Sequence, residues 1–273
     1  MTQDSTSVPI ESLQPASIGY LQLIKAVLYR EYLIFVRYPL NAVGGLFSQL
    51  AFFILLFYGG KMLVGHALTD QLEGIIVGYF LWSLSVSAYY EMSGDLGREV
   101  QWGTLERHFI TPFGFAPIAL AKGVAKIVRA FLTSLIVLGV MILITGKTLS
   151  LGFLTIVPVA TLSILSVLGL GFAAGGVTVL YKRIGSLLTF LQFTFIPLIS
   201  APAFNLAWTR YLPLAQGSAL LQRAMVEGDR LWELPPLALA VLVGTAVGYL
   251  LLGYFVFHLA TRRARRLGVL GHY

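Results

Sequence analysis

Long uncharged runs of apolar residues constrain this chain more than any other feature. One of them, NAVGGLFSQLAFFILLFYGG, lies between Arg37 and Lys61 and holds no charged residue. A helix rises about 1.5 Å per residue, so a run of about 20 residues crosses the roughly 30 Å hydrocarbon core of a bilayer. Only 11% of the 273 residues are charged, and 57% are hydrophobic. The sequence therefore predicts an all-α membrane protein.

Six such runs predict six transmembrane helices in a single domain, residues 17–266. Pro235 and Pro236 open the last run, where proline suits the first turn of a helix. A flexible tail, residues 1–16, precedes the domain and a short tail, residues 267–273, follows it. The expected spans are residues 41–60, 74–90, 126–146, 151–180, 184–203 and 235–260.

The distribution of basic residues predicts the orientation. Six crossings place both termini on one side of the membrane, and Lys and Arg concentrate in cytoplasmic loops. We therefore expect both termini in the cytoplasm and the protein in the cytoplasmic membrane. This bias also accounts for the net charge of +7, so we expect the lipid bilayer and not nucleic acid as a partner. Of the 19 Lys and Arg residues, only five fall on the outer side: Lys61, Lys147, Arg210, Arg223 and Arg230.

An amphipathic segment, residues 17–38, precedes the first crossing. Leu21, Ile24 and Leu28 recur in it at helical spacing, whereas its charged residues fall on other faces. Such a helix lies in the membrane interface. We expect it to end at Pro39. An additional span is the alternative, which the charges of the segment oppose.

A basic stripe marks the start of the third crossing. Lys122, Lys126 and Arg129 recur at i, i+4 and i+7, so they share one face of a helix. A stripe of this kind binds either anionic headgroups or a partner. We expect headgroups.

The chain carries no motif for ATP binding or catalysis. The Walker sequence GxxxxGK[ST] is absent, the four His residues lack ligand spacing, and there is no Cys. We therefore expect no cofactor, metal or catalytic residue on this chain. Three acidic residues, Glu91, Asp95 and Glu99, recur at i, i+4 and i+8. We expect them near a helix start, whose positive end favours acidic side chains.

The segment REVQWGTLERHFITPF, residues 98–113, is charged although its surroundings are apolar. Its apolar and charged residues alternate in a roughly helical pattern that Pro112 ends. A loop that only joined two crossings would need a few residues. We therefore expect a short cytoplasmic helix at about residues 94–111. It either docks on a soluble partner or rests on the headgroups.

Residues 203–234 are too apolar for an exposed loop and too broken for a span. Within them, SALLQRAMVEG predicts a short helix with Ser218 as its N-cap and Gly228 as its end. Short helices that re-enter the outer leaflet satisfy their own backbone hydrogen bonds. A folded outer cap without a gating role is the alternative.

The pattern E-x-x-x-G-T-L-E followed by T-P, at residues 99–106 and 111–112, resembles the cytoplasmic-loop signature of type-2 ABC exporter permeases. The interfacial helix, the six crossings and the broken segment before the last one agree with this resemblance. It implies that a coupling helix docks on a separate ATP-binding cassette subunit, which binds ATP and Mg²⁺. The coupling-helix residues carried over by the resemblance are Glu99, Gly103, Thr104, Leu105, Glu106, Arg107 and Phe109.

The same resemblance implies a second copy of this chain, or a related permease, as a partner. In the family, re-entrant helices before the last crossing close the outer mouth. The residues of the substrate path or outer gate implied here are Phe204, Trp208, Pro213, Leu221 and Met225.

The expected function is the permease subunit of an ATP-driven exporter. Apolar crossings fit an amphipathic drug- or lipid-like substrate, and a polysaccharide or lipid-linked glycan is the alternative within the class. A membrane-embedded lipid-modifying enzyme and a non-transporting anchor subunit are alternatives of another class. Either of these predicts that no ATPase co-purifies with the chain.

Overall fold

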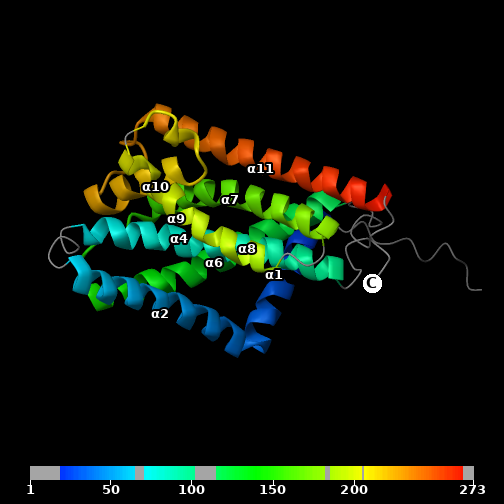
Figure 1. Ribbon diagram of the computed structural model, residues 1–273, viewed down its shortest axis with the longest axis horizontal. Helices are drawn as coiled ribbons and strands as arrows, with labels where there is room; N and C mark the ends of the chain where they lie inside the picture. The colour runs from blue at the N-terminus through cyan, green and yellow to red at the C-terminus, as the bar shows by residue number, and fades with distance from the viewer. Residues whose placement is uncertain (1–18, 65–70, 102–114, 182–184, 205, 267–273) are drawn as a thin grey trace, which may run out of the picture.

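The computed structural model is an elongated bundle whose long helices run along a common direction (Figure 1). It describes residues 19–64, 71–101, 115–181, 185–204 and 206–266. Over these ranges the chain is helical and contains no strand, which confirms the all-α prediction. The helices are α1 (Tyr20–Arg37), α2 (Pro39–Val64), α4 (Leu72–Gln101), α6 (Phe115–Thr145), α7 (Phe153–Tyr181), α8 (Gly185–Leu191), α9 (Phe195–Ser200), α10 (Ala215–Gln222) and α11 (Pro236–Arg266).

Five of these helices are long and apolar enough to cross a membrane: α2, α4, α6, α7 and α11. The remaining expected crossing, residues 184–203, is a chain of short helical pieces. In it, α8 and α9 are joined by a 3₁₀ turn, and Pro197 and Pro202 each lack the N–H that a continuous helix needs. The pieces follow one another along the long axis of the bundle (Figure 1). A sixth crossing at this place stays a prediction.

Proline and glycine mark several helix ends as expected. α1 ends at Arg37, and Pro39 begins α2. Gly146 follows α6 with φ +65°, a backbone conformation that glycine adopts without strain, and its N–H donates to the Ile142 carbonyl over 2.9 Å. Pro236 is the first residue of α11.

The tightest packing joins α7 to α11 through glycine. A Cβ atom at Gly169 would collide with the backbone of Tyr249, and one at Gly253 would collide with the backbone of Gly169. A Cβ at Gly176 would lie 2.9 Å from the Cα of Phe257. Small residues allow helices in a membrane to approach this closely. α7 is accordingly buried along much of its length, against α4 on one side and α11 on the other.

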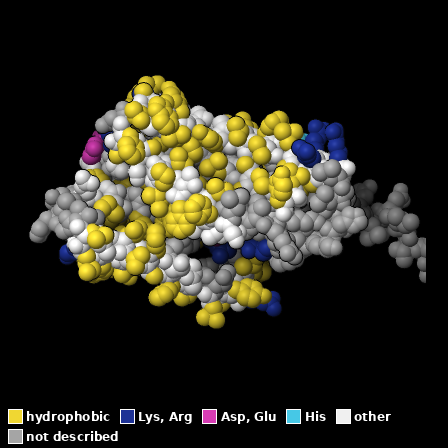
Figure 2. All heavy atoms as spheres, viewed as in Figure 1, with side chains coloured by type: hydrophobic (Ala, Val, Ile, Leu, Met, Phe, Trp, Pro, Cys, Tyr) yellow, Lys and Arg dark blue, Asp and Glu magenta, His cyan; other side chains and the backbone are white. Residues whose placement is uncertain are grey.

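α2 is attached quite differently, by one edge. The Phe52 ring lies 5.2 Å from the ring of Trp82, and the Phe53 ring lies 5.1 Å from that of Tyr79, so large side chains bridge α2 to α4. Most of the other α2 side chains are exposed, and Met62 is 89% exposed. Figure 2 shows the surface hollowed between this part of the molecule and the rest of the bundle, with basic side chains visible inside.

The segment before α11 consists of short helices. α10 begins at Ala215, three residues before Ser218, so the predicted N-cap is wrong. The residue before this helix is Leu214, whose φ of +69° places the chain in the left-handed region. The helical stretch ends at Gly228 with φ +83°, as predicted. The N–H of Ser150 donates to the Met225 carbonyl over 2.9 Å and ties this segment to the chain before α7.

Candidate functional site

The expected coupling helix lies mostly outside the described residues. Of the residues carried over to it, only Glu99 is described, and it belongs to α4. Residues 94–101 are the C-terminal end of α4 and do not begin a separate helix. The other expected residues, Gly103, Thr104, Leu105, Glu106, Arg107 and Phe109, lie outside the described residues.

The three acidic residues Glu91, Asp95 and Glu99 lie in the C-terminal half of α4. Their expected place near a helix start is therefore wrong. The C-terminal end of a helix carries a partial negative charge and disfavours carboxylates. Because Asp95 and Glu99 are buried, basic side chains from elsewhere in the bundle must stabilise their carboxylates.

The basic stripe of α6 supplies those cations. Lys126 Nζ lies 2.6 Å from Asp95 Oδ2, and Lys122 pairs with Glu99. Arg129 Nε lies 3.0 Å from Glu91 Oε1. Lys122 and Lys126 are buried, so the expectation that they bind lipid headgroups is wrong. The acidic row of α4 and the basic row of α6 repeat at similar helical spacing. Because these two helices face each other, each acidic residue meets a basic one.

Glu31 of α1 joins the same group of charges. It is 6% exposed, and its Oε2 lies 3.4 Å from Lys126 Nζ and 3.6 Å from Arg129 Nη1. Lys126 is thereby shared by carboxylates from two helices. We call this group, which links α1, α4 and α6, the charge cluster; its members are Glu31, Glu91, Asp95, Glu99, Lys122, Lys126 and Arg129.

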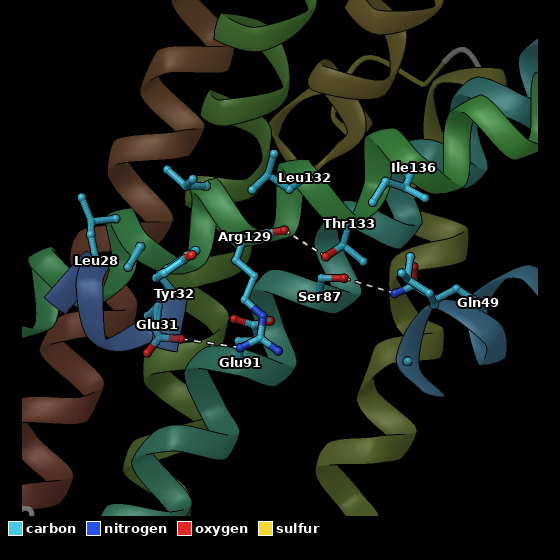
Figure 3. Close-up of a pocket in the computed structure, with 14 residues that line it drawn as sticks. Leu28, Glu31, Tyr32, Gln49, Ser87, Glu91, Arg129, Leu132, Thr133 and Ile136 are labelled. Atoms are coloured by element: carbon cyan, nitrogen blue, oxygen red, sulfur yellow. Dashed lines mark hydrogen bonds and ion pairs between the residues drawn. The ribbon is translucent and has the colours of Figure 1, made fainter. Parts of the chain in front are cut away.

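A cavity of about 350 Å³ opens beside the charge cluster, between α1, α2, α4 and α6 (Figure 3). Glu31, Glu91 and Arg129 stand together at one end, whereas Ile136 lies farther along α6. The cavity is therefore charged at one end and mainly apolar along its wall. Its lining residues are Leu28, Glu31, Tyr32, Gly45, Leu46, Gln49, Ser87, Glu91, Ala125, Val128, Arg129, Leu132, Thr133 and Ile136.

Gln49 connects α2 to the rest of the bundle at this cavity. Its Nε2 donates to Ser87 Oγ over 3.1 Å, and its Oε1 accepts from Ser83 Oγ over 2.8 Å. Ser83 is also hydrogen-bonded to Ser134 of α6 over 3.1 Å. In the absence of water a buried amide needs such partners. These bonds hold α2 in one orientation about its own axis.

The expected outer-gate residues do not form one group. Phe204 and Trp208 are 67% and 60% exposed, whereas Pro213, Leu221 and Met225 are buried in the bundle. Leu221 and Met225 belong to the main apolar core. Their side chains thus stabilise the short helices, and a role of the five residues in a substrate path stays a prediction.

The charge cluster was not predicted, although the sequence contains its signal. An acidic row on one expected helix and a basic row on the next carry opposite charges at matching spacing. Because the acidic row is expected at a helix start and the basic row at lipid headgroups, the ion pairs that the two rows form with each other are missed. Glu31 gives no comparable signal, because it comes from a helix far away in the sequence.

The chain matches the model of a known protein family. The model of the ABC-2 type transporter membrane family matches residues 22–205, which include the charge cluster and the cavity. The comparisons with curated proteins and with solved structures give no significant match. The family match covers more than half of the chain and agrees with the long membrane-crossing helices. The chain therefore belongs to the ABC-2 type transporter membrane family.

Proposed function

We propose that this chain is the permease of an ATP-driven exporter and that a separate ATP-binding subunit docks on the segment at about residues 94–111. Membership of the family makes the chain the membrane subunit of an ABC transporter, a partner of an ATP-binding cassette protein. The proposal adds the docking segment, the direction of transport and the substrate. The observation that carries it is the position of the charge cluster.

The charge cluster joins the two helices that flank residues 102–111 of the proposed docking segment, and its members Asp95 and Glu99 lie at the start of that segment. α4 leads into residues 102–114 and α6 leads out of them, and the Glu99–Lys122 ion pair joins these two helices. Removing one partner of a buried ion pair costs about 3–5 kcal/mol, so the joined ends resist separation. A displacement of the segment by a docked ATPase is thus transmitted to both helices together, and to α1 through Glu31.

The transported molecule in this proposal is amphipathic and drug- or lipid-like. The cavity beside the charge cluster is bordered by α2, whose outer surface is apolar and exposed, as expected of a helix in contact with lipid. A molecule dissolved in the leaflet can reach such a cavity without crossing water. We further propose that a second copy of the chain completes the path and that both termini are cytoplasmic, as the basic residues predict.

Co-purification tests the docking segment. The tagged chain is extracted in mild detergent from cells that carry its natural ATP-binding partner, and ATPase activity is measured in the eluate. Glu106→Arg and Gly103→Trp change the centre of the segment, and we expect each to lower the co-purified activity at least about ten-fold, as for the loss of an interface hot spot. Glu227→Arg, a charge reversal at a side chain that is 61% exposed near α10, is the matched control and retains the activity.

A folded, monodisperse wild-type chain that brings down no ATP-binding protein contradicts the proposal. Equal loss in Glu227→Arg would show that charge reversal acts through folding and not through docking. If the partner binds all four proteins equally, the docking site lies elsewhere on the chain.

A further inference from the structure

We propose that the cavity beside the charge cluster binds an amphipathic cation, a molecule with one ammonium group and an apolar body. Its role as the transported substrate rests on the proposed function, whereas its binding depends on this chain alone. The size of the cavity, the charges at one end of it and the hydrogen bonds of its wall support this inference.

The cavity has the size and the lining of a small-molecule site. Its volume of about 350 Å³ falls within the roughly 300–1,000 Å³ typical of such sites, which are mostly apolar with a few polar groups. Leu46, Leu132 and Ile136 supply apolar surface from α2 and α6. The hollow seen in Figure 2 beside α2 leaves this region open on the side of the bundle, where lipid would lie.

Two of the three charged side chains that line the cavity are acidic. Of the charged residues that line it, Glu31 and Glu91 are acidic and only Arg129 is basic. Arg129 is already shared between these two carboxylates, over 3.6 Å and 3.0 Å. An anionic group would have to compete with both of them for Arg129. Lys126 also lies near these carboxylates, 3.4 Å from Glu31 Oε2 and 3.6 Å from Glu91 Oε2. A cation instead meets an oxygen of Glu91 that accepts no hydrogen bond from the described part of the chain.

Glu91 also has an oxygen that lacks a hydrogen bond. Its Oε1 faces Arg129, but its Oε2 lies 3.6 Å from Lys126 Nζ, beyond hydrogen-bonding distance, and has no hydrogen-bond partner within the described ranges. Leaving a buried carboxylate oxygen unpaired is unfavourable. The last torsion of a Glu side chain is soft, so a small rotation presents this oxygen to the cavity. An ammonium N–H supplies the donor.

The other polar groups of the wall do not require a ligand. Gln49 is hydrogen-bonded to Ser83 and Ser87, and Thr133 Oγ1 donates to the Arg129 carbonyl over 3.0 Å. Figure 3 shows the hydrogen bonds between Gln49 and Ser87 and between Thr133 and Arg129 as dashed lines. The unsatisfied group is at the charged end, which places the ammonium there and the apolar body along α6 and α2.

Photolabelling tests the proposal on the chain alone, reconstituted in lipid nanodiscs without any ATP-binding subunit. Three probes share one diazirine-bearing alkyl chain and end in an ammonium, a hydroxyl or a carboxylate group. Mass spectrometry then locates the labelled peptides. We expect the ammonium probe to label the cavity peptides at least about ten-fold more than the hydroxyl probe, as a charge-assisted hydrogen bond implies.

Two variants with matched controls identify the site. Glu91→Gln removes the carboxylate whose Oε2 lacks a hydrogen bond among the described residues, and Glu73→Gln makes the same change on α4 at its far end. Gly45→Leu fills the cavity, since a Cβ there meets no atom within 4 Å, and Gly44→Leu adds the same bulk with equally open surroundings outside the lining. We expect Glu91→Gln and Gly45→Leu to reduce ammonium labelling to the hydroxyl level, and the two controls to leave it unchanged.

Equal labelling by the ammonium and hydroxyl probes would overturn the proposal and leave an apolar crevice. Preferred labelling by the carboxylate probe would assign the site to anions at Arg129. Because Gly45→Leu keeps every charge, undiminished labelling in that variant contradicts the proposal even if Glu91→Gln fails to fold. The test contains no ATPase, so its failure leaves the docking proposal standing, and failure of co-purification leaves the cation site standing.

Discussion

The two halves of the bundle are held together by different means. α7 and α11 meet backbone to backbone, with Gly169 against Gly253 and no room for a side chain between them. α1 and α2 are joined to α4 and α6 by long side chains: ion pairs of Glu31, hydrogen bonds of Gln49, and tilted or edge-to-face contacts between aromatic rings. Close backbone packing holds α7 against α11, whereas directional polar contacts account for much of the attachment of α1 and α2.

This difference separates a rigid part from an adjustable part. Helices that pack through glycine have one closest arrangement, and a shift of either helix produces collisions. Helices bridged by long side chains can move apart by a few tenths of an ångström while the side chains follow. The cavity and the proposed docking segment both belong to the adjustable half. The rigid half is then the frame against which α1, α2 and the ends of α4 and α6 move.

The largest effect is expected from adding a side chain inside the glycine contact. Gly253→Leu places atoms where the Gly169 backbone lies, so α7 and α11 must separate, at a cost of roughly 3 kcal/mol or more. Gly248→Leu, on the same helix with no atom within 4 Å of its Cβ position, is the control and keeps wild-type stability. Fluorescence-detected size exclusion after heating measures both. Comparable melting of the two variants would contradict a frame built on glycine packing.

An intermediate effect is expected from removing the central lysine. Lys126→Met leaves the carboxylates of Glu31, Glu91 and Asp95 with too few cations, which destabilises the folded chain by about 3 kcal/mol, at the lower end for a broken buried ion pair. Lys147→Met breaks a partly exposed pair with Glu73 and is expected to cost no more than about 1 kcal/mol. The same thermal assay compares them, and a difference smaller than the error would show that the charge cluster is solvated.

Gln49→Leu is expected to have the smallest effect on stability but a specific effect on the position of α2. Hydrogen bonds between membrane helices contribute about 0.6 kcal/mol on average, so the chain stays folded while α2 loses its fixed orientation. The absence of cysteine allows spin labels at Met62→Cys on α2 and Leu143→Cys on α6, both exposed.

The distance distribution between these two labels then reports the position of α2. We expect it to broaden in Gln49→Leu and to stay narrow in Ser48→Leu, a change at the exposed neighbouring residue. An unchanged distribution in Gln49→Leu would mean that the aromatic contacts alone hold α2.

The crossings were predictable because charge-free apolar runs of sufficient length have few alternatives in a bilayer. α2, α6, α7 and α11 contain most of the residues predicted for their spans. α4 runs eleven residues beyond Tyr90, where the predicted span ended because Glu91 follows. A charged residue need not end a helix inside the bundle when it has an ion-pair partner. Glu91 has two such partners on α6, Lys126 and Arg129.

The cavity was not predictable, because its walls come from four helices and depend on how each is rotated. Gln49 and Ser87 are ordinary polar residues of two apolar runs when the sequence is read alone. Their meeting follows only from the packing of α2 on α4. Whether Glu91 Oε2 accepts a hydrogen bond from Lys126 likewise depends on distances of a few tenths of an ångström, which residue spacing does not determine.

The loose attachment of α2 has a consequence for how such permeases diversify. A wall that contacts the frame along one edge can accept a larger or smaller residue at a position such as Gly45 without disturbing the core. Selection for a new transported molecule can therefore act on α2 alone, one residue at a time, while the sequence of α7 and α11 stays under constraint. Divergence among related permeases should then be concentrated in the first crossing.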